Sequence, residues 1–441
     1  MFAAAKRHPS LSRAAASSVR SAASSVRSAA GRYLDARRLL HTPASAQSRR
    51  GLDWMNFFVA DVQTGFGTFV AFYLAELGWS QANIGVALAI NGIAGMLCQI
   101  PGGAFADTVT WKRGLAAIGI VMTAAAALIL AFAPGYFAVL LAQLLQGATA
   151  GVLTPAIGAI SLGLVGRSGM SLRTGRNYRY SAAGHALTAA FMGVAGAYIA
   201  KGAIFIAAAL LCIPALIALS YIRGDEINYA RARNASGRDK SADVARVFDL
   251  CKNHKLVMFT AAIVLFQFAD ASVLPLIGEN LATSIHDNAA IWMSGLIIVP
   301  QILVAILAPW VGFHSEKRGR RPLLLLGFAL EPVRTVLLAC SATYPAFVVA
   351  QAMSGVTGAI IGVMTVLVIT DLTAGSGRFN LAVGTVGALS GVAASISTGA
   401  TGFLFQALGP RWGYLPLAAV AAAATALLWV FLSETKPEKY E

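Results

Sequence analysis

Charged residues are scarce in this chain. Only 12% of its 441 residues are Asp, Glu, Lys or Arg, and 57% are hydrophobic, whereas a soluble domain has roughly 25% charged and 45–50% apolar residues. So few charged side chains cannot cover the surface of a water-soluble protein of this length. The composition therefore excludes a soluble enzyme or binding domain.

The sequence also lacks the patterns typical of disulfide-bonded, metal-binding and catalytic proteins. The four cysteines have no paired spacing, so neither a disulfide framework nor a metal site is predicted. The sequence contains no GxxxxGK[ST] phosphate loop, no GxSxG elbow, no metal-spaced His/Cys cluster and no cofactor fingerprint. We therefore expect no enzyme, no cofactor and no ATP-driven pump on this chain alone.

Long apolar stretches are abundant. Each runs for about 20 residues, the length at which a helix crosses the ~30 Å hydrocarbon core of a bilayer. The twelve expected transmembrane helices lie at residues 54–77, 82–105, 115–133, 136–165, 182–200, 203–222, 256–277, 290–312, 323–342, 346–370, 381–407 and 412–432. The predicted fold class is an all-α membrane protein.

The net charge of +15 is concentrated in particular loops. Beyond the first 50 residues, Lys and Arg gather in loops that follow even-numbered helices, while the opposite loops carry only Lys201 and Arg411. This asymmetry predicts that both termini and the basic loops are cytosolic. It accounts for the charge without a nucleic-acid partner, and we expect the protein in the plasma membrane.

Residues 1–50 form a separate basic tail. They hold ten Lys or Arg against one acid, and Lys6, Arg13, Arg20 and Arg27 recur at a spacing of seven. The pattern fits an organelle-targeting sequence, which would move the protein to the mitochondrial inner membrane. A disordered cytosolic tail, or a start codon placed too far upstream, is the alternative.

The second half of the chain repeats the first at an offset of 209 residues. The shift carries the loop Gly103–Asp107 onto Gly312–Glu316, and Asp61 onto Asp270. Many secondary transporters are built from two related halves that are as hydrophobic as these. The predicted bundles are 51–222 and 256–435, joined by a polar cytosolic loop at 223–255 and followed by a tail at 436–441.

Twelve helices in two halves, with a Gly-x-x-x-Asp loop and basic residues between the second and third helices, resemble the major facilitator superfamily. The resemblance covers about residues 51–435 and implies two pseudo-symmetric six-helix bundles whose loop acids latch the cytosolic end. The latch residues it implies are Gly103, Asp107 and Arg113, and Gly312, Glu316, Arg320 and Arg321. Asp107 with Arg113 is the expected main pair, and Glu316 with Arg320 or Arg321 the weaker one. The alternative is that these charges only set topology.

Two features depart from that family's drug–proton antiporters. Many members carry an Arg in the fourth helix, where this chain has Gln143, and the segment 182–200 lacks the proline of the antiporter signature. Both weaken an assignment to proton-driven efflux. The likeness is closer to uncharacterised bacterial-type members, judged from residues 57–63 and 371–380.

Polar side chains at membrane depth are costly, so each is a candidate for function. The resemblance places helices 1, 4, 7 and 10 around a central cavity. The candidates for substrate binding or proton coupling on these helices are Asp61, Gln63, Gln143, Gln267, Asp270 and Gln351. Hydrogen bonding to neighbouring helices is the alternative for each of them.

Two charged pairs receive other interpretations. Glu331 and Arg334 lie three residues apart in the ninth segment and are interpreted as structural. Asp371 and Arg378 flank the loop between the tenth and eleventh segments and are interpreted as a cytosolic gating pair.

We therefore predict a secondary transporter that moves a small organic molecule by alternating access, by symport or antiport, with the proton as candidate coupling ion. Two cavity carboxylates without the helix 4 Arg favour a neutral or cationic substrate. The expected partners are the lipid bilayer and the substrate, with no nucleic acid, and the protein is expected to be a monomer. A non-transporting sensor or adaptor that retains the fold is the rival prediction.

Overall fold

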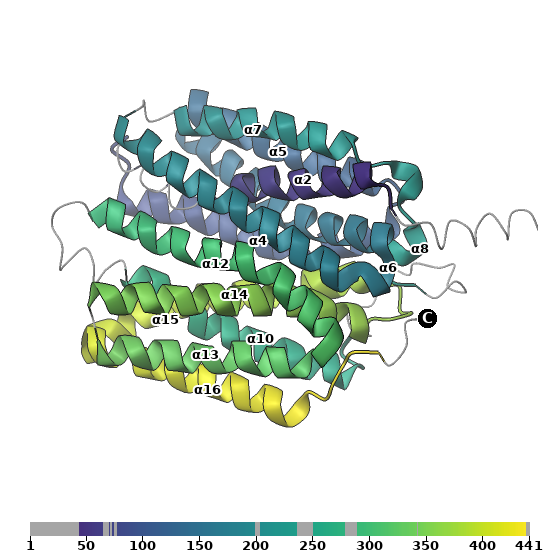
Figure 1. The fold of residues 1–441 in the computed structure, drawn as a ribbon. Helices are drawn as coiled ribbons and strands as arrows, with labels where there is room; N and C mark the ends of the chain where they lie inside the picture. The colour runs from purple at the N-terminus through teal and green to yellow at the C-terminus, as the bar shows by residue number, and fades with distance from the viewer. Residues whose placement is uncertain are drawn as a thin grey trace, which may run out of the picture. The chain divides into compact units, whose positions relative to one another are not determined.

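The computed structural model consists of long helices joined by short connections (Figure 1). The structure describes residues 44–64, 70, 73–74, 77–198, 203–235, 250–277, 289–341 and 343–437, and Ser45–Glu441 forms one compact unit. Of the basic tail expected at residues 1–50, residues 1–43 lie outside the described residues, while residues 46–50 belong to the first named helix.

The first half contains five named helices, followed by two short ones in the linker. They are α2 (Ala46–Thr64), α4 (Gln81–Thr108), α5 (Lys112–Phe132), α6 (Tyr136–Tyr198), α7 (Ala203–Ser220), η1 (Gly224–Glu226) and α8 (Tyr229–Ala232). The second half contains α10 (His254–Asp270), α12 (Ala289–Arg318), α13 (Arg321–Cys340), α14 (Tyr344–Leu372), α15 (Phe379–Trp412) and α16 (Tyr414–Phe431).

The helix α6 contains two of the expected spans in direct succession. Its backbone turns at Gly166, where φ is 67°, a conformation that favours glycine. The next helix starts immediately, so the loop expected between residues 165 and 182 is wrong. Because the segment is helical, Arg173 and Arg176 lie one turn apart on one helix face.

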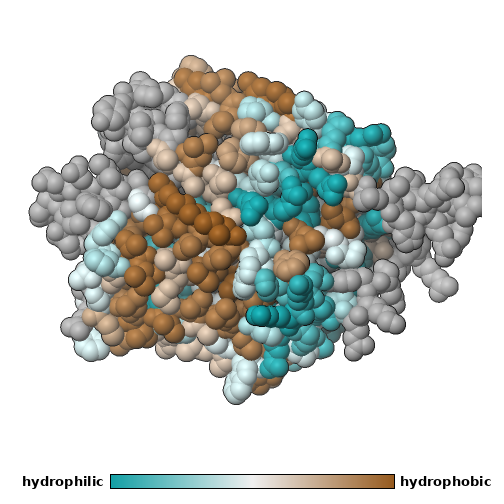
Figure 2. Space-filling view, in the orientation of Figure 1, coloured by the Kyte–Doolittle hydropathy of each residue, from teal (hydrophilic) through white to brown (hydrophobic). Residues whose placement is uncertain are grey.

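The helices have the length and surface of a membrane protein. Within the described ranges, nine helices are long and apolar enough to cross a membrane, with α6 counted once, and Phe205–Ser220 is a shorter apolar helix. The count of twelve therefore remains a prediction. Large apolar side chains such as Leu97, Phe132 and Phe137 are exposed by 70%, 72% and 83%, which suits contact with lipid. Figure 2 shows an apolar surface bordered by hydrophilic residues at the end where α8 and the C-terminus lie.

The two halves pack against each other mainly through two helix pairs. The helix α12 runs along α6, and α15 runs along α4 (Figure 1). Hydrogen bonds link the connections at one end of the bundle, which we call the basic end. These connections lie near residues 109–111, 166, 223–235, 319–320, 373–378 and 432–437. The connections near 133–135 and 341–343 lie at the opposite end.

Candidate functional site

Glycine brings α4 and α15 together at the basic end. A Cβ atom on Gly103 would lie closer than 3.0 Å to the carbonyl oxygen of Asn380, and one on Gly384 would lie equally close to that of Gln99. Real Cβ atoms essentially never approach so closely. Glycine at both positions therefore permits the backbones of the two halves to touch.

The second helix pair repeats this arrangement. A Cβ on Gly175 of α6 would lie 2.6 Å from the Ala308 carbonyl oxygen of α12, and one on Gly312 would lie under 3.0 Å from that of Ser171. The 209-residue shift carries Gly103 onto Gly312 and Gly175 onto Gly384. Both contacts between the halves thus use glycines related by the internal repeat.

Asp107 caps the first turn of α15. Its Oδ1 accepts hydrogen bonds from the Asn380 backbone N–H at 3.2 Å and from Asn380 Nδ2 at 2.8 Å, and its Oδ2 accepts from the Leu381 N–H at 2.8 Å. A carboxylate is favoured there by the unpaired N–H groups and by the helix dipole. The expected pairing with Arg113 is not among these contacts, and Arg113 Nη2 donates to the Ser220 carbonyl at 3.4 Å.

Glu316 occupies the repeat-related position in the second half. It accepts a hydrogen bond from the hydroxyl of Ser171, which the 209-residue shift relates to Asn380. It also forms the expected ion pair with Arg320, at 3.2 Å. Both loop acids therefore bind a helix of the other half, and neither partner was predicted from the sequence.

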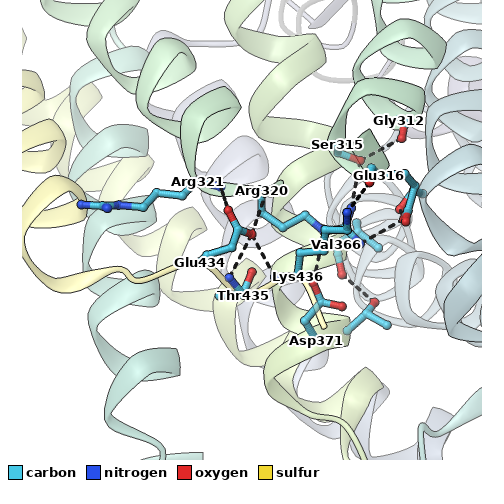
Figure 3. Close-up of polar contacts among 12 residues, drawn as sticks. Gly312, Ser315, Glu316, Arg320, Arg321, Val366, Asp371, Glu434, Thr435 and Lys436 are labelled. Carbon is cyan, nitrogen blue, oxygen red and sulfur yellow. Dashed lines mark hydrogen bonds and ion pairs between the residues drawn. The ribbon is translucent and has the colours of Figure 1, made fainter. Parts of the chain in front are cut away.

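Arg320 is the centre of a buried network (Figure 3). Its side chain is 1% exposed, and its guanidinium contacts Asp371 at 3.1 Å, Glu316 at 3.2 Å and the Ser315 hydroxyl at 3.0 Å. Asp371, expected to gate with Arg378, thus pairs with Arg320. The backbone N–H of Arg378 donates to Ser376 Oγ at 3.2 Å.

Glu434, beyond α16, caps the start of α13. It accepts hydrogen bonds from the N–H groups of Arg320 at 2.8 Å and Arg321 at 3.1 Å (Figure 3). Burial raises the pKa of the Glu434 carboxyl, but these donors and two more from Thr435 and Lys436 outweigh it, so the pKa lies below its usual value. Arg321, the alternative partner expected for Glu316, donates from Nη2 to the Trp429 carbonyl at 2.7 Å.

A buried ion-pair cluster lies between α2 and α6 and was not predicted from the sequence. Asp53, 2% exposed, pairs with Arg173, 3% exposed, and with Arg176, 48% exposed. Arg173 also donates to Asn177 Oδ1 at 2.7 Å. The available signal was a single acid at the start of an apolar segment, together with two arginines at helical spacing.

The linker between the halves closes the basic end from outside. Ala232 and Asn234 are buried, and the Ala232 carbonyl accepts from Asn380 Nδ2 at 2.9 Å, the amide that also binds Asp107. Asn234 Nδ2 donates to the Thr370 carbonyl at 2.7 Å, and the N–H of Asn228 donates to the Gly163 carbonyl at 3.1 Å. The linker therefore contacts both halves where they meet.

A second group of charged residues lies at membrane depth in the second half. Arg334 Nη2 on α13 contacts Asp270 Oδ1 on α10 at 2.7 Å and Glu331 Oε1 on its own helix at 2.6 Å. Glu331 is 0% exposed, Arg334 2% and Asp270 35%. The structure thus unites Asp270 with the pair interpreted as structural, and we call these three residues the charged triad.

The helix carrying Asp270 is interrupted directly after it. The helix α10 ends at Asp270, the chain turns at Ala271 and Ser272, and a helical turn resumes over residues 273–277. Pro275 has no N–H to donate to the Ala271 carbonyl four residues earlier, which explains the interruption. Broken helices at membrane depth commonly mark binding sites in transporters.

The remaining candidates lie in different surroundings. Gln143 is 1% exposed and accepts a hydrogen bond from Asn91 Nδ2 at 3.0 Å, and Gln351 is 3% exposed. Gln267 is partly exposed, one turn before Asp270. The side chains of Asp61 and Gln63 lie outside the described residues. Among the described residues, no group of three or more His, Cys, Asp and Glu side chains could hold a metal ion.

Comparison with known proteins places this architecture in a family. A family model described as Major Facilitator Superfamily matches residues 52–330 and 259–441. An uncharacterized MFS-type transporter of Mycobacterium tuberculosis is 33% identical over 389 residues, which cover 88% of this chain and 93% of that protein. The class B tetracycline resistance protein of Escherichia coli is 33% identical over 106 residues, 24% of this chain and 26% of that protein.

A solved structure agrees at the level of the fold. The nucleoside transporter NupG superposes with a TM-score of 0.63 at 14% sequence identity, over 87% of this chain and 100% of that chain. The matches cover both halves of the repeat. The chain therefore belongs to the Major Facilitator Superfamily, a family of membrane transporters, and is a multi-pass integral membrane protein.

Proposed function

We propose that the protein is a secondary transporter that works by alternating access, and that this structure represents the state closed at the basic end. The observation that carries the proposal is the repeated contact between the halves. At each of the two helix pairs, glycines allow backbone contact, and Asp107 or Glu316 binds a helix of the opposite half. Opening the basic end would break both contacts.

The strength of these contacts suits a reversible latch. A hydrogen bond to a charged group contributes about 1.5–3 kcal/mol, so the three donors on Asp107 stabilise closure by only a few kcal/mol after solvation of the separated groups. An equilibrium of that size is one that substrate or protons can shift. The acids thus act as latch residues. If the charges of this loop only set topology, the Lys and Arg residues would suffice and the acids would not be needed.

The proposed orientation rests on the same end of the molecule. The Lys and Arg residues gathered there favour the cytosolic side, so both termini are proposed to be cytosolic and this state to be open toward the outside. We further propose that the protein is a monomer in the plasma membrane.

The cargo we propose is a small organic molecule, neutral or cationic. The interrupted helix at Asp270 and the excess of acids in the charged triad support this choice. The partial likeness to a tetracycline resistance protein agrees with an organic cargo. Proton coupling through Asp270 is part of the proposal, with Asp61 as its repeat-related counterpart.

The test has two stages. Purified protein is screened by thermal shift against metabolites and drugs at two pH values, where a ligand at about 100 times its Kd adds roughly 2.7 kcal/mol of stability. Each stabilising compound is then offered to proteoliposomes containing wild type or Asp107→Asn protein. Saturable flux that Asp107→Asn slows would support the proposal, whereas stabilisation without flux would favour the sensor or adaptor.

A further inference from the structure

The charged triad holds more negative than positive charge. Two carboxylates, Asp270 and Glu331, share the single guanidinium of Arg334, and both bonds come from Nη2, at 2.7 and 2.6 Å. If all three groups were ionised, one negative charge would remain uncompensated. A net charge at membrane depth costs several kcal/mol, so a positive charge from outside the triad must balance it.

No described side chain around the triad supplies that charge. The helix α16 carries no Asp, Glu, His, Lys or Arg, and Asp371 and Tyr344 are at the two ends of α14. On α12, α10 and α13, the remaining charged or His side chains lie near the basic end: His314, Glu316, Lys317, Arg318, His254, Lys255 and Arg321. Arg378 precedes α15, and the side chain of Arg411, at the far end of that helix, is not among those described.

We propose that the triad carries one exchangeable proton, shared between Asp270 and Glu331, and that Arg334 is its positioning residue. The proposal rests on the proposed transport function and deepens it, because it assigns the coupling site to three residues of the second half. The Oε2 atom of Glu331 is buried and has no hydrogen-bond partner among the described residues. A carboxyl with one unpaired oxygen is a poor site for a full charge and accommodates a proton more readily.

The geometry also supplies a route for the proton. Asp270 is 35% exposed and lies at the interruption of its helix, whereas Glu331 is fully buried behind Arg334. A hydronium ion transfers its proton to the Asp270 carboxylate and leaves as water. The proton passes on to Glu331, whose buried Oε2 has no other partner among the described residues. Arg334 then neutralises Asp270 alone, and the triad is electrically balanced. Loss of the proton draws Arg334 back toward both acids.

The site is confined to one half of the repeat. The 209-residue shift places Met122 and Ala125 where the second half has Glu331 and Arg334. The first half therefore lacks the buried acid and its counter-ion, even though Asp61 matches Asp270. We infer that the two halves have unequal roles, with the exchangeable proton held in the second.

Proton uptake without substrate tests the proposal. Infrared difference spectra between high and low pH, recorded on purified full-length protein, should show a triad band equivalent to one proton, in addition to the bands of the other carboxyls that titrate over the same range. Asp270→Asn and Glu331→Gln should each abolish this band, because each leaves a neutral pair with Arg334. Arg334→Gln should enlarge it toward two protons, because both carboxyls then lack a counter-ion.

A surface variant and the transport assay complete the design. Asp225→Asn changes a carboxylate that is 69% exposed beside Arg223, and should leave the triad band unchanged. A band of wild-type size in Asp270→Asn and Arg334→Gln would overturn the proposal even if Glu331→Gln does not fold. Because no substrate is present, a protein that shows the band but transports nothing would overturn the transport function and uphold the proton site.

Discussion

Asp53 and Asp225, both at the basic end, are expected to contribute very differently to the free energy of unfolding. Asp53 is 2% exposed and bound by Arg173 and Arg176, whereas Asp225 is 69% exposed beside Arg223. Removing one partner of a buried ion pair leaves an uncompensated charge. An exposed pair is solvated and contributes little.

We expect Asp53→Asn to lower the free energy of unfolding by about 3 kcal/mol, since Arg173 would remain buried without its counter-ion. Asp225→Asn should change it by about 0–1 kcal/mol. Thermal unfolding of both variants in the same detergent measures the difference. Equal melting temperatures for the two variants would show that the Asp53 cluster does not hold α2 against α6.

Gly103 provides a second prediction at this scale. Gly103→Ala introduces a methyl group against the Asn380 backbone, and such overpacking costs about 1–3 kcal/mol, which should separate α4 from α15. Gly85→Ala, in the same helix with no atom within 4 Å of the new Cβ, is the matched control. The readout is alkylation of a single cysteine at Leu381, which is 5% exposed, in a background without native cysteines. Faster alkylation is expected only with Gly103→Ala, and equal rates would contradict the close contact.

At the scale of elements, apolar length predicted that long helices exist but not how they connect. The two spans within α6 were predicted, yet the direct turn at Gly166 was not, because a single glycine gives no periodic signal. The interruption of α10 has a local cause in Pro275, which lacks an N–H for the helix. The partners of Asp270 were not predicted, since they come from a helix about 60 residues further along and only packing brings them together.

The capping of α13 by Glu434 leads to a prediction about pH. The pKa of Glu434 is lowered in the folded protein, so its contribution to stability is fully present above the unfolded pKa, near 4.5, and is lost as the pH falls through the folded value. A carboxylate at an exposed helix N-terminus contributes about 0.3–1 kcal/mol. Glu434→Gln should therefore be less stable than wild type at pH 7, by that amount.

The difference should vanish on acidification. Unfolding curves of both proteins at pH 7 and at successively lower pH values, below 4.5, test this. A stability gap that persists unchanged in acid would show that the loss comes from packing of the residues after α16 and not from the charge of Glu434.

At the scale of the whole molecule, the 209-residue repeat carried the most information. It singled out the acid and the first glycine of each contact between the halves, because these recur in the sequence itself. It did not predict Asn380 and Ser171 as their partners, although the same shift relates those two residues. They lie on helices of the opposite half, and sequence spacing within one half contains no trace of contacts between halves.

The burial of the linker between the halves was also not predicted from the sequence. A polar segment of mixed charge was expected to be a loop, and yet Ala232 and Asn234 are buried between the halves. Their bonds to Asn380 and Thr370 mean that opening the basic end must also release this segment. The basic end is thus held together by contacts from both halves and from the chain that joins them.

Double electron–electron resonance in nanodiscs tests the central claim of alternating access most directly. One label pair, at Thr110 and Ser376, reports on the basic end, and another, at Ala133 and Thr343, reports on the opposite end, with the native cysteines replaced. We predict that Asp107→Asn lengthens the first distance and shortens the second. Unchanged distances at both ends, or a lengthened basic-end distance with no response at the opposite end, would contradict alternating access.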